Sequence, residues 1–134
     1  MALLARRRNV HDGLGQPPMS GLLSIVHGGR LPEGKVPETK ADFPPDIVFE
    51  IISSADSASQ MARKRKDYQE SGIIQVWVDP QKRLVELDYP DRPAQYFAGD
   101  QSLAIDKLPN FIQGFASTLF FCRLMKIRIV SCRA

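Results

Sequence analysis

The residue of this sequence with the clearest capacity for chemistry is Glu50, a lone acid inside the apolar segment DIVFEII at residues 46–52. In an extended chain alternate side chains share a face, so Glu50 lies beside Val48 and Ile52. A strand that is apolar on both faces is usually covered on both sides. An ionised carboxylate there is costly unless it is paired, hydrogen-bonded or bound to a metal. Two interpretations stay open, a metal ligand or a structural acid that reaches water or a basic partner at the end of a sheet.

A helix is predicted after this strand, from about Asp56 to Ser71. Ser57 and Gln60 have the spacing of a capping box, which marks a helix start. Gly72 stands where a helix commonly ends. The strand and the helix are therefore expected to be adjacent in the fold.

The inward face of this helix is narrow and carries a lysine at its edge. At about 100° per residue, Met61 and Tyr68 mark the apolar stripe. Lys64 and Arg65 fall on its two flanks, so Lys64 can point back toward the sheet. The alternative is that residues 63–66 form a solvated basic run, which is the commoner arrangement for such charges.

These segments, taken in order, resemble the C-terminal half of the Uma family of restriction endonucleases, in the PD-(D/E)XK nuclease superfamily. The similarity covers roughly residues 30–120. It is carried by PD-I-V-F-E-I-I-S at 45–53, K-x-x-x-Y at 64–68, E-S-G at 70–72, V-W-V-D-P at 76–80 and L-P-N-F at 108–111.

The resemblance implies an α/β fold with a restriction-endonuclease-like core and a mixed sheet. It implies a metal-dependent DNA endonuclease that hydrolyses phosphodiesters, with Mg²⁺ as cofactor and DNA as partner. Glu50 matches the family's strand glutamate and is the expected catalytic and metal-binding residue. The lysine of the superfamily's E-x-K would fall at Ile52, and the family pattern offers Lys64 as the catalytic lysine instead.

The upstream acids of the family are not recognisable in this sequence. Counting back from Arg30, the position of the family's proline-aspartate pair falls at about 21–22, and Asp12 cannot be carried over. Asp46 is about 13 Å from Glu50 at the rise of a strand, so we expect it to begin the strand rather than share a metal. We therefore expect a core that is truncated on its N-terminal side, with an incomplete magnesium site.

The chain is expected to divide into an irregular or degenerate segment at 1–40, a nuclease-like core at 41–120 and a divergent tail at 121–134. Gly, Pro and charged residues without a sustained period predict loop or disorder over 1–40. Length and a hydrophobic content of 43% fit one small domain.

Three further strands are predicted inside the core. Residues 73–78 and 83–87 are joined by the turn sequence at 79–82 and are expected to form a hairpin. Residues 94–97 add a third antiparallel strand. Trp77 is expected to be a core residue rather than a platform for stacking bases.

The formal net charge of +3 comes from the ends of the chain. Three arginines at 6–8 and four basic residues at 123–133 account for seven of the 18 Lys and Arg, which leaves 11 against 15 acids and a net charge of −4 elsewhere. Phosphate affinity would then depend on local clusters such as residues 63–66.

Location and redox state follow from what the sequence contains. Cys122 and Cys132 lack metal-ligand spacing and are expected to be free thiols. The sequence contains no run of 18 apolar residues, the length that would predict a membrane span. MALLARRR is a poor secretory signal, so we expect a cytoplasmic protein.

Three functions stay open from the sequence. The first is the Mg²⁺-dependent endonuclease. The second is a non-catalytic module on the same scaffold, which binds nucleic acid or a protein partner and could form a homodimer. The third is a gene fragment with no function of its own.

Overall fold

The fold is that of a computed structural model, which describes residues 2–5, 23–31, 33, 43–54, 56–119 and 130–131. Among these residues, seven strands form one sheet in the order β6-β5-β4-β3-β2-β1-β9. The strands are β1 (Ala2–Ala5), β2 (Leu23–His27), β3 (Ile47–Ile51), β4 (Ile74–Asp79), β5 (Leu84–Asp88), β6 (Gln95–Ala98) and β9 (Val130–Ser131). A second sheet pairs β7 (Leu103–Ile105) with β8 (Leu108–Gln113). The helical elements are η1 (Gly28–Arg30), α1 (Ala58–Glu70) and a helical stretch at 115–119.

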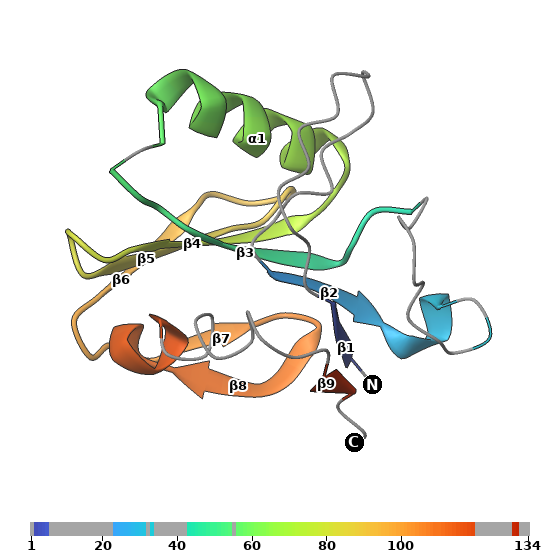
Figure 1. The fold of residues 1–134 in the computed structure, drawn as a ribbon. Coiled ribbons are helices and arrows are strands. Elements are labelled where there is room, and N and C mark those ends of the chain that lie inside the picture. The colour runs from blue at the N-terminus through green and yellow to red at the C-terminus, as the bar shows by residue number, and fades with distance from the viewer. Residues whose placement is uncertain are drawn as a thin grey trace.

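The described elements form three layers (Figure 1). Helix α1 lies on one face of the large sheet, and the β7-β8 hairpin lies on the opposite face. The large sheet is mixed, because β3 and β4 are parallel while the other pairs are antiparallel. This architecture confirms the α/β fold with a mixed sheet.

Helix α1 connects the two parallel strands. Ser57 caps it, since the Ser57 side chain accepts from the backbone N–H of Gln60 while the Gln60 side chain accepts from the backbone N–H of Ser57. Gly72 follows the helix with φ +70°, a conformation that glycine adopts without steric cost. The predicted capping box and helix end are confirmed.

The strands after α1 follow the sequence expectations closely. β4 and β5 form an antiparallel hairpin, in which the side chain of Asp79 accepts from the backbone N–H of Gln81 and of Lys82. β6 pairs antiparallel with β5. No helix in the described part of the chain is both long and apolar enough to cross a membrane.

The expectation of loop or disorder throughout 1–40 was wrong for two segments. β1 and β2 pair with one another, and β2 also pairs antiparallel with β3. Leu23–Val26 is buried along its whole length, including the polar Ser24, so burial does not alternate along this strand. The division of the chain into 1–40, 41–120 and 121–134 stays a prediction. Asp12, Cys122 and Cys132 lie outside the described residues.

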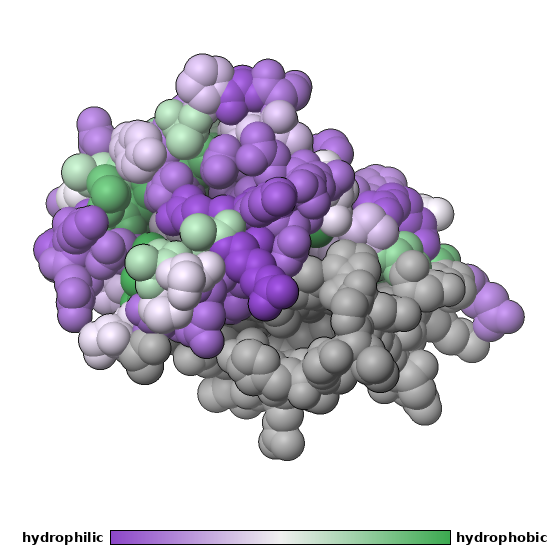
Figure 2. All heavy atoms as spheres, turned by 90° about the horizontal axis from the view of Figure 1, so that it is seen from above, coloured by the Kyte–Doolittle hydropathy of each residue, from purple (hydrophilic) through white to green (hydrophobic). Residues whose placement is uncertain are grey.

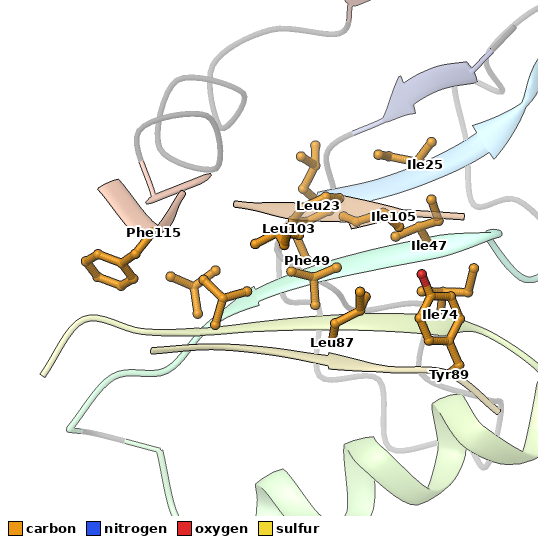
Figure 3. Packing of buried hydrophobic residues seen from close by; sticks show 13 residues of the cluster. Leu23, Ile25, Ile47, Phe49, Ile74, Leu87, Tyr89, Leu103, Ile105 and Phe115 are labelled. Carbon is orange, nitrogen blue, oxygen red and sulfur yellow. The ribbon is translucent and has the colours of Figure 1, made fainter. Parts of the chain in front are cut away.

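Side chains of β3 supply both faces of the sheet, as their alternation predicts. Ile47 and Phe49 join the larger core cluster, between the large sheet and the β7-β8 side. Figure 3 shows side chains of that cluster, with Leu103 and Ile105 of β7 near those of the large sheet. Val48 faces α1 in a smaller cluster with Tyr68, Ile73 and Trp77. Glu50 belongs to this second face.

Candidate active site

Glu50 lies in the interior of the large sheet, on the side covered by α1. Its strand is hydrogen-bonded on both sides, to β2 and to β4, and Glu50 is opposite Trp77 of β4. The residue is 6% exposed. The carboxylate therefore needs partners from the protein, because little water reaches it.

Lys64 is one of those partners. Its Nζ lies 3.4 Å from both Oε1 and Oε2 of Glu50. This geometry confirms the expected proximity of the two side chains, while their catalytic role stays a prediction. The Lys64 side chain is 28% exposed, so its ammonium is at the boundary between the core and solvent.

The contact between Glu50 and Lys64 is long for an ion pair. Charge-assisted N–H···O bonds are usually about 2.7–2.9 Å. Arg65, the neighbour of Lys64 on α1, pairs with Glu86 of β5 at 2.8 Å. The basic run therefore divides, with Arg65 held tightly in a structural pair and Lys64 held loosely beside Glu50.

Tyr68 is the second partner of Glu50. Its hydroxyl donates to Oε1 at 2.7 Å, and the side chain is fully buried. The sequence places Tyr68 on the apolar stripe but does not identify this hydrogen bond. The available signal is the spacing of four between Lys64 and Tyr68, which puts both side chains on one helix face.

Burial raises the pKa of the Glu50 carboxyl above its ordinary value of 4.5. Desolvation is the largest cause, and the charge of Asp56 adds to it. The charge of Lys64 and the hydrogen bonds from Tyr68 and Lys64 act in the opposite direction but do not compensate fully. Glu50 is thus an acid whose charge is incompletely compensated in the apo protein.

Two successive side-chain hydrogen bonds from β4 hold helix α1 on the sheet. The Gln75 side chain donates to the backbone carbonyl of Arg65 at 3.2 Å and accepts from Trp77 Nε1 at 2.9 Å. The guanidinium of Arg65 lies over the Trp77 ring, 4.4 Å from its centroid. Trp77 is 2% exposed, which confirms that it is a core residue. These contacts set the rotation of α1 that brings Lys64 to Glu50.

Asp46 is placed away from this arrangement and has a structural role. Its carboxylate accepts from the backbone N–H of His27 and from the guanidinium of Arg30, each at 2.7 Å. Arg30 also donates to the carbonyl of Pro44 at 3.0 Å. Asp46 therefore joins the start of β3 to the end of β2, as expected for a residue that begins the strand.

Among the described residues, Glu50 would supply one ligand of a magnesium site. Magnesium in nuclease-type sites is usually held by one or two carboxylates together with phosphate and water. Glu50 supplies one carboxylate whose charge lacks full compensation, and Asp56 is close enough for its charge to act on Glu50. Within the described part of the chain there is no group of three or more His, Cys, Asp or Glu residues that could hold a metal. The segment 21–22, where the family has its proline-aspartate pair, lies outside the described residues.

The surface of α1 that faces away from the sheet is mostly hydrophilic, as expected for a helix that packs on the sheet through one face (Figure 2). In the described part of the chain, the mixed sheet with α1 on one face is that of an α/β protein with a restriction-endonuclease-like core. A family model described as "Putative restriction endonuclease", Uma2, matches residues 23–118, which is well over half of the chain. The chain belongs to this family.

A solved structure supports the same fold. The crystal structure of a "putative nuclease belonging to DUF820" from Anabaena variabilis matches with a TM-score of 0.60 and 17% sequence identity. The match covers 76% of this chain, and this chain spans 60% of the length of that structure. Comparison with curated protein sequences gave no match.

Proposed function

We propose that this protein is of the Mg²⁺-dependent DNA endonuclease type, with Glu50 and Lys64 as its catalytic residues. The observation that carries the proposal is the pair itself: a buried acid with incompletely compensated charge, faced by a loosely held lysine. A structural ion pair would be expected to have the closer contact of Arg65 and Glu86. Membership of the Uma2 family favours a nuclease over other chemistries for this pair.

Each residue has a definite part in the proposed reaction. Glu50 would hold the cation through its carboxylate. Bound Mg²⁺ supplies Lewis-acid polarisation of the phosphate and a water of lowered pKa. Lys64, with its ammonium at the solvent boundary, would stabilise the negative charge that develops on the phosphate or orient the attacking water. Lys64 would move from Glu50 to the phosphate with little loss, because their contact is long.

The number of carboxylates limits how tightly the cation binds. Glu50 is the one acid that the proposal assigns as a ligand, and DNA phosphate and water would complete an octahedral shell. We therefore expect weak Mg²⁺ binding without DNA and weak cleavage by the isolated chain. We also propose that the protein acts in the cytoplasm, as expected from its sequence.

A nicking assay on supercoiled plasmid tests the proposal. The pure chain is incubated with Mg²⁺ or with EDTA, in parallel with Glu50→Ala and Lys64→Met. The expected result is slow nicking that requires Mg²⁺ and is lost in both variants. Glu86→Gln is the matched control, because it removes a carboxylate on the same sheet face that the proposal leaves out of the reaction.

One observation favours a second candidate, a non-catalytic module that binds nucleic acid or a protein partner. It is that the described residues contain no cluster of three or more metal-ligating side chains. This candidate predicts no nicking by wild type, with duplex binding that is unchanged by EDTA and by Glu50→Ala. A homodimer is compatible with this second candidate and is tested by sedimentation of the pure chain.

A further inference from the structure

The two carboxylate oxygens of Glu50 have different surroundings. Oε1 accepts from the Tyr68 hydroxyl at 2.7 Å and lies 3.4 Å from Lys64 Nζ. Oε2 has, among the described residues, only the 3.4 Å contact with Lys64. One oxygen is thus occupied by a short, buried hydrogen bond, and the other is held by a long contact with a partly exposed side chain.

Tyr68 itself has little freedom to move. Its ring is fully buried with Val48, Ile73 and Trp77, and the Trp77 ring is tilted by 50° at a centroid distance of 6.5 Å. Its backbone carbonyl accepts from the N–H of Ile73 at 3.0 Å, where the chain turns through Gly72. Because the ring and the backbone of Tyr68 are both held in place, its hydroxyl restrains the position of the carboxylate oxygen that accepts from it.

We propose that Tyr68 is a positioning residue that locks the Glu50 carboxylate and leaves Oε2 as the oxygen that binds the cation. This inference rests on the proposed function. Magnesium-type cations need near-ideal octahedral geometry, with bonds of about 2.0–2.1 Å, so a ligand oxygen that can rotate binds them poorly. Lys64 cannot provide the lock, because its contacts are long and its proposed task is at the phosphate.

A positioning role of Tyr68 can be distinguished by experiment from a role in packing α1 alone. A tyrosine that only fills the core would affect stability and leave cation affinity unchanged. Groups that hydrogen-bond a ligating side chain typically change metal affinity by about 10–100-fold when they are removed. Cation affinity is therefore the quantity that distinguishes the two roles.

The test uses Mn²⁺ alone as the probe, with free Mn²⁺ measured by electron paramagnetic resonance. We expect Tyr68→Phe to bind Mn²⁺ at least about tenfold more weakly than wild type. Tyr89→Phe is the matched control, because Tyr89 is also buried and its hydroxyl also has a hydrogen bond, from the backbone N–H of Asp106 at 3.0 Å. Tyr89 belongs to the core cluster on the other side of the sheet, so Tyr89→Phe should retain wild-type affinity.

The outcomes separate this inference from the proposed function. If Glu50→Gln weakens Mn²⁺ binding while Tyr68→Phe binds as wild type does, the positioning role is overturned and the proposed function stands. If Glu50→Gln and wild type bind equally, Glu50 is not a ligand and both are overturned.

A second variant covers the case in which Tyr68→Phe fails to fold. Glu50→Asp keeps the charge but withdraws the carboxylate from the Tyr68 hydroxyl by one methylene. We expect its Mn²⁺ affinity to fall by a similar factor. Wild-type affinity in folded Glu50→Asp would overturn the positioning role.

Discussion

Replacing Glu50 by Gln is expected to leave the apo protein equally stable or more stable at neutral pH. The amide keeps the shape of the side chain and can still accept from the Tyr68 hydroxyl. It removes a charge that burial disfavours, since the pKa of Glu50 is raised chiefly by desolvation. Lys64 loses its partner but is 28% exposed, so its ammonium can turn to water.

The expected gain follows from two opposed effects. A hydrogen bond to a charged acceptor is worth about 1.5–3 kcal/mol and a neutral one about 0.5–1.5 kcal/mol, so the weaker bond from Tyr68 costs about 1 kcal/mol. The desolvation of a buried carboxylate costs several kcal/mol before compensation, and Lys64 compensates only in part because its contact is long. The balance gives a gain of about 0 to 2 kcal/mol in the free energy of unfolding.

The difference in stability between Glu50→Gln and wild type should depend on pH. The folded-state pKa of Glu50 is raised above its ordinary value of 4.5, so the folded state binds this proton more tightly than the unfolded state. The contribution of Glu50 to stability is therefore fully present below about pH 4.5 and is lost as the pH rises through the raised folded-state value. Glu50→Gln should lack this loss, so its advantage over wild type should grow over the same interval.

Urea denaturation in EDTA at several pH values measures both effects. Glu86→Gln serves as the comparison, because it removes one member of the 2.8 Å pair with Arg65 and should lower stability by about 1 kcal/mol. A loss of more than about 1 kcal/mol in Glu50→Gln at neutral pH would refute the reasoning and identify Glu50 as a structural acid held by Lys64.

Substitutions at three other positions test how the site is supported. Ser57→Ala should lower the free energy of unfolding by about 1 kcal/mol in urea denaturation, because it removes the N-cap hydrogen bond of α1. Gly72→Ala should cost about 1 kcal/mol and Gly72→Asn less, because a Cβ at Gly72 meets no atom within 4 Å and the cost comes from φ +70° alone; equal stability of all three proteins would contradict this. Trp77→Phe should cost about 1–3 kcal/mol by circular dichroism, because it leaves the buried Gln75 Oε1 without its 2.9 Å donor and puts a smaller ring under Arg65.

The parts of the fold that sequence predicts are those with a local signal. The capping box at Ser57 and the alternation around Glu50 both act within a few residues, and they gave the helix, the strand and the approach of Lys64. β2 was missed because this five-residue strand, buried on both faces, carries no sustained polar and apolar period, and its identity depends on pairing with β3.

Two other features depend on contacts that a sequence does not display. The β7-β8 turn places Lys107 at φ +66°, without the glycine or asparagine that usually signals such a turn. Tyr68 was predicted on the apolar stripe, but the acceptor of its hydroxyl depends on the distance between α1 and the sheet.

The position of β3 between two hydrogen-bonded neighbours has a consequence for motion. Its amides are paired with β2 or β4, so their hydrogen exchange should require cooperative opening of the central sheet rather than fraying. Helix α1 lies on the outside of the fold and is fixed to the sheet mainly through its side chains, so its exchange should be faster (Figure 1). When a substrate binds, adjustment of the distance between Glu50 and Lys64 would then come from displacement of the helix over a sheet that remains rigid.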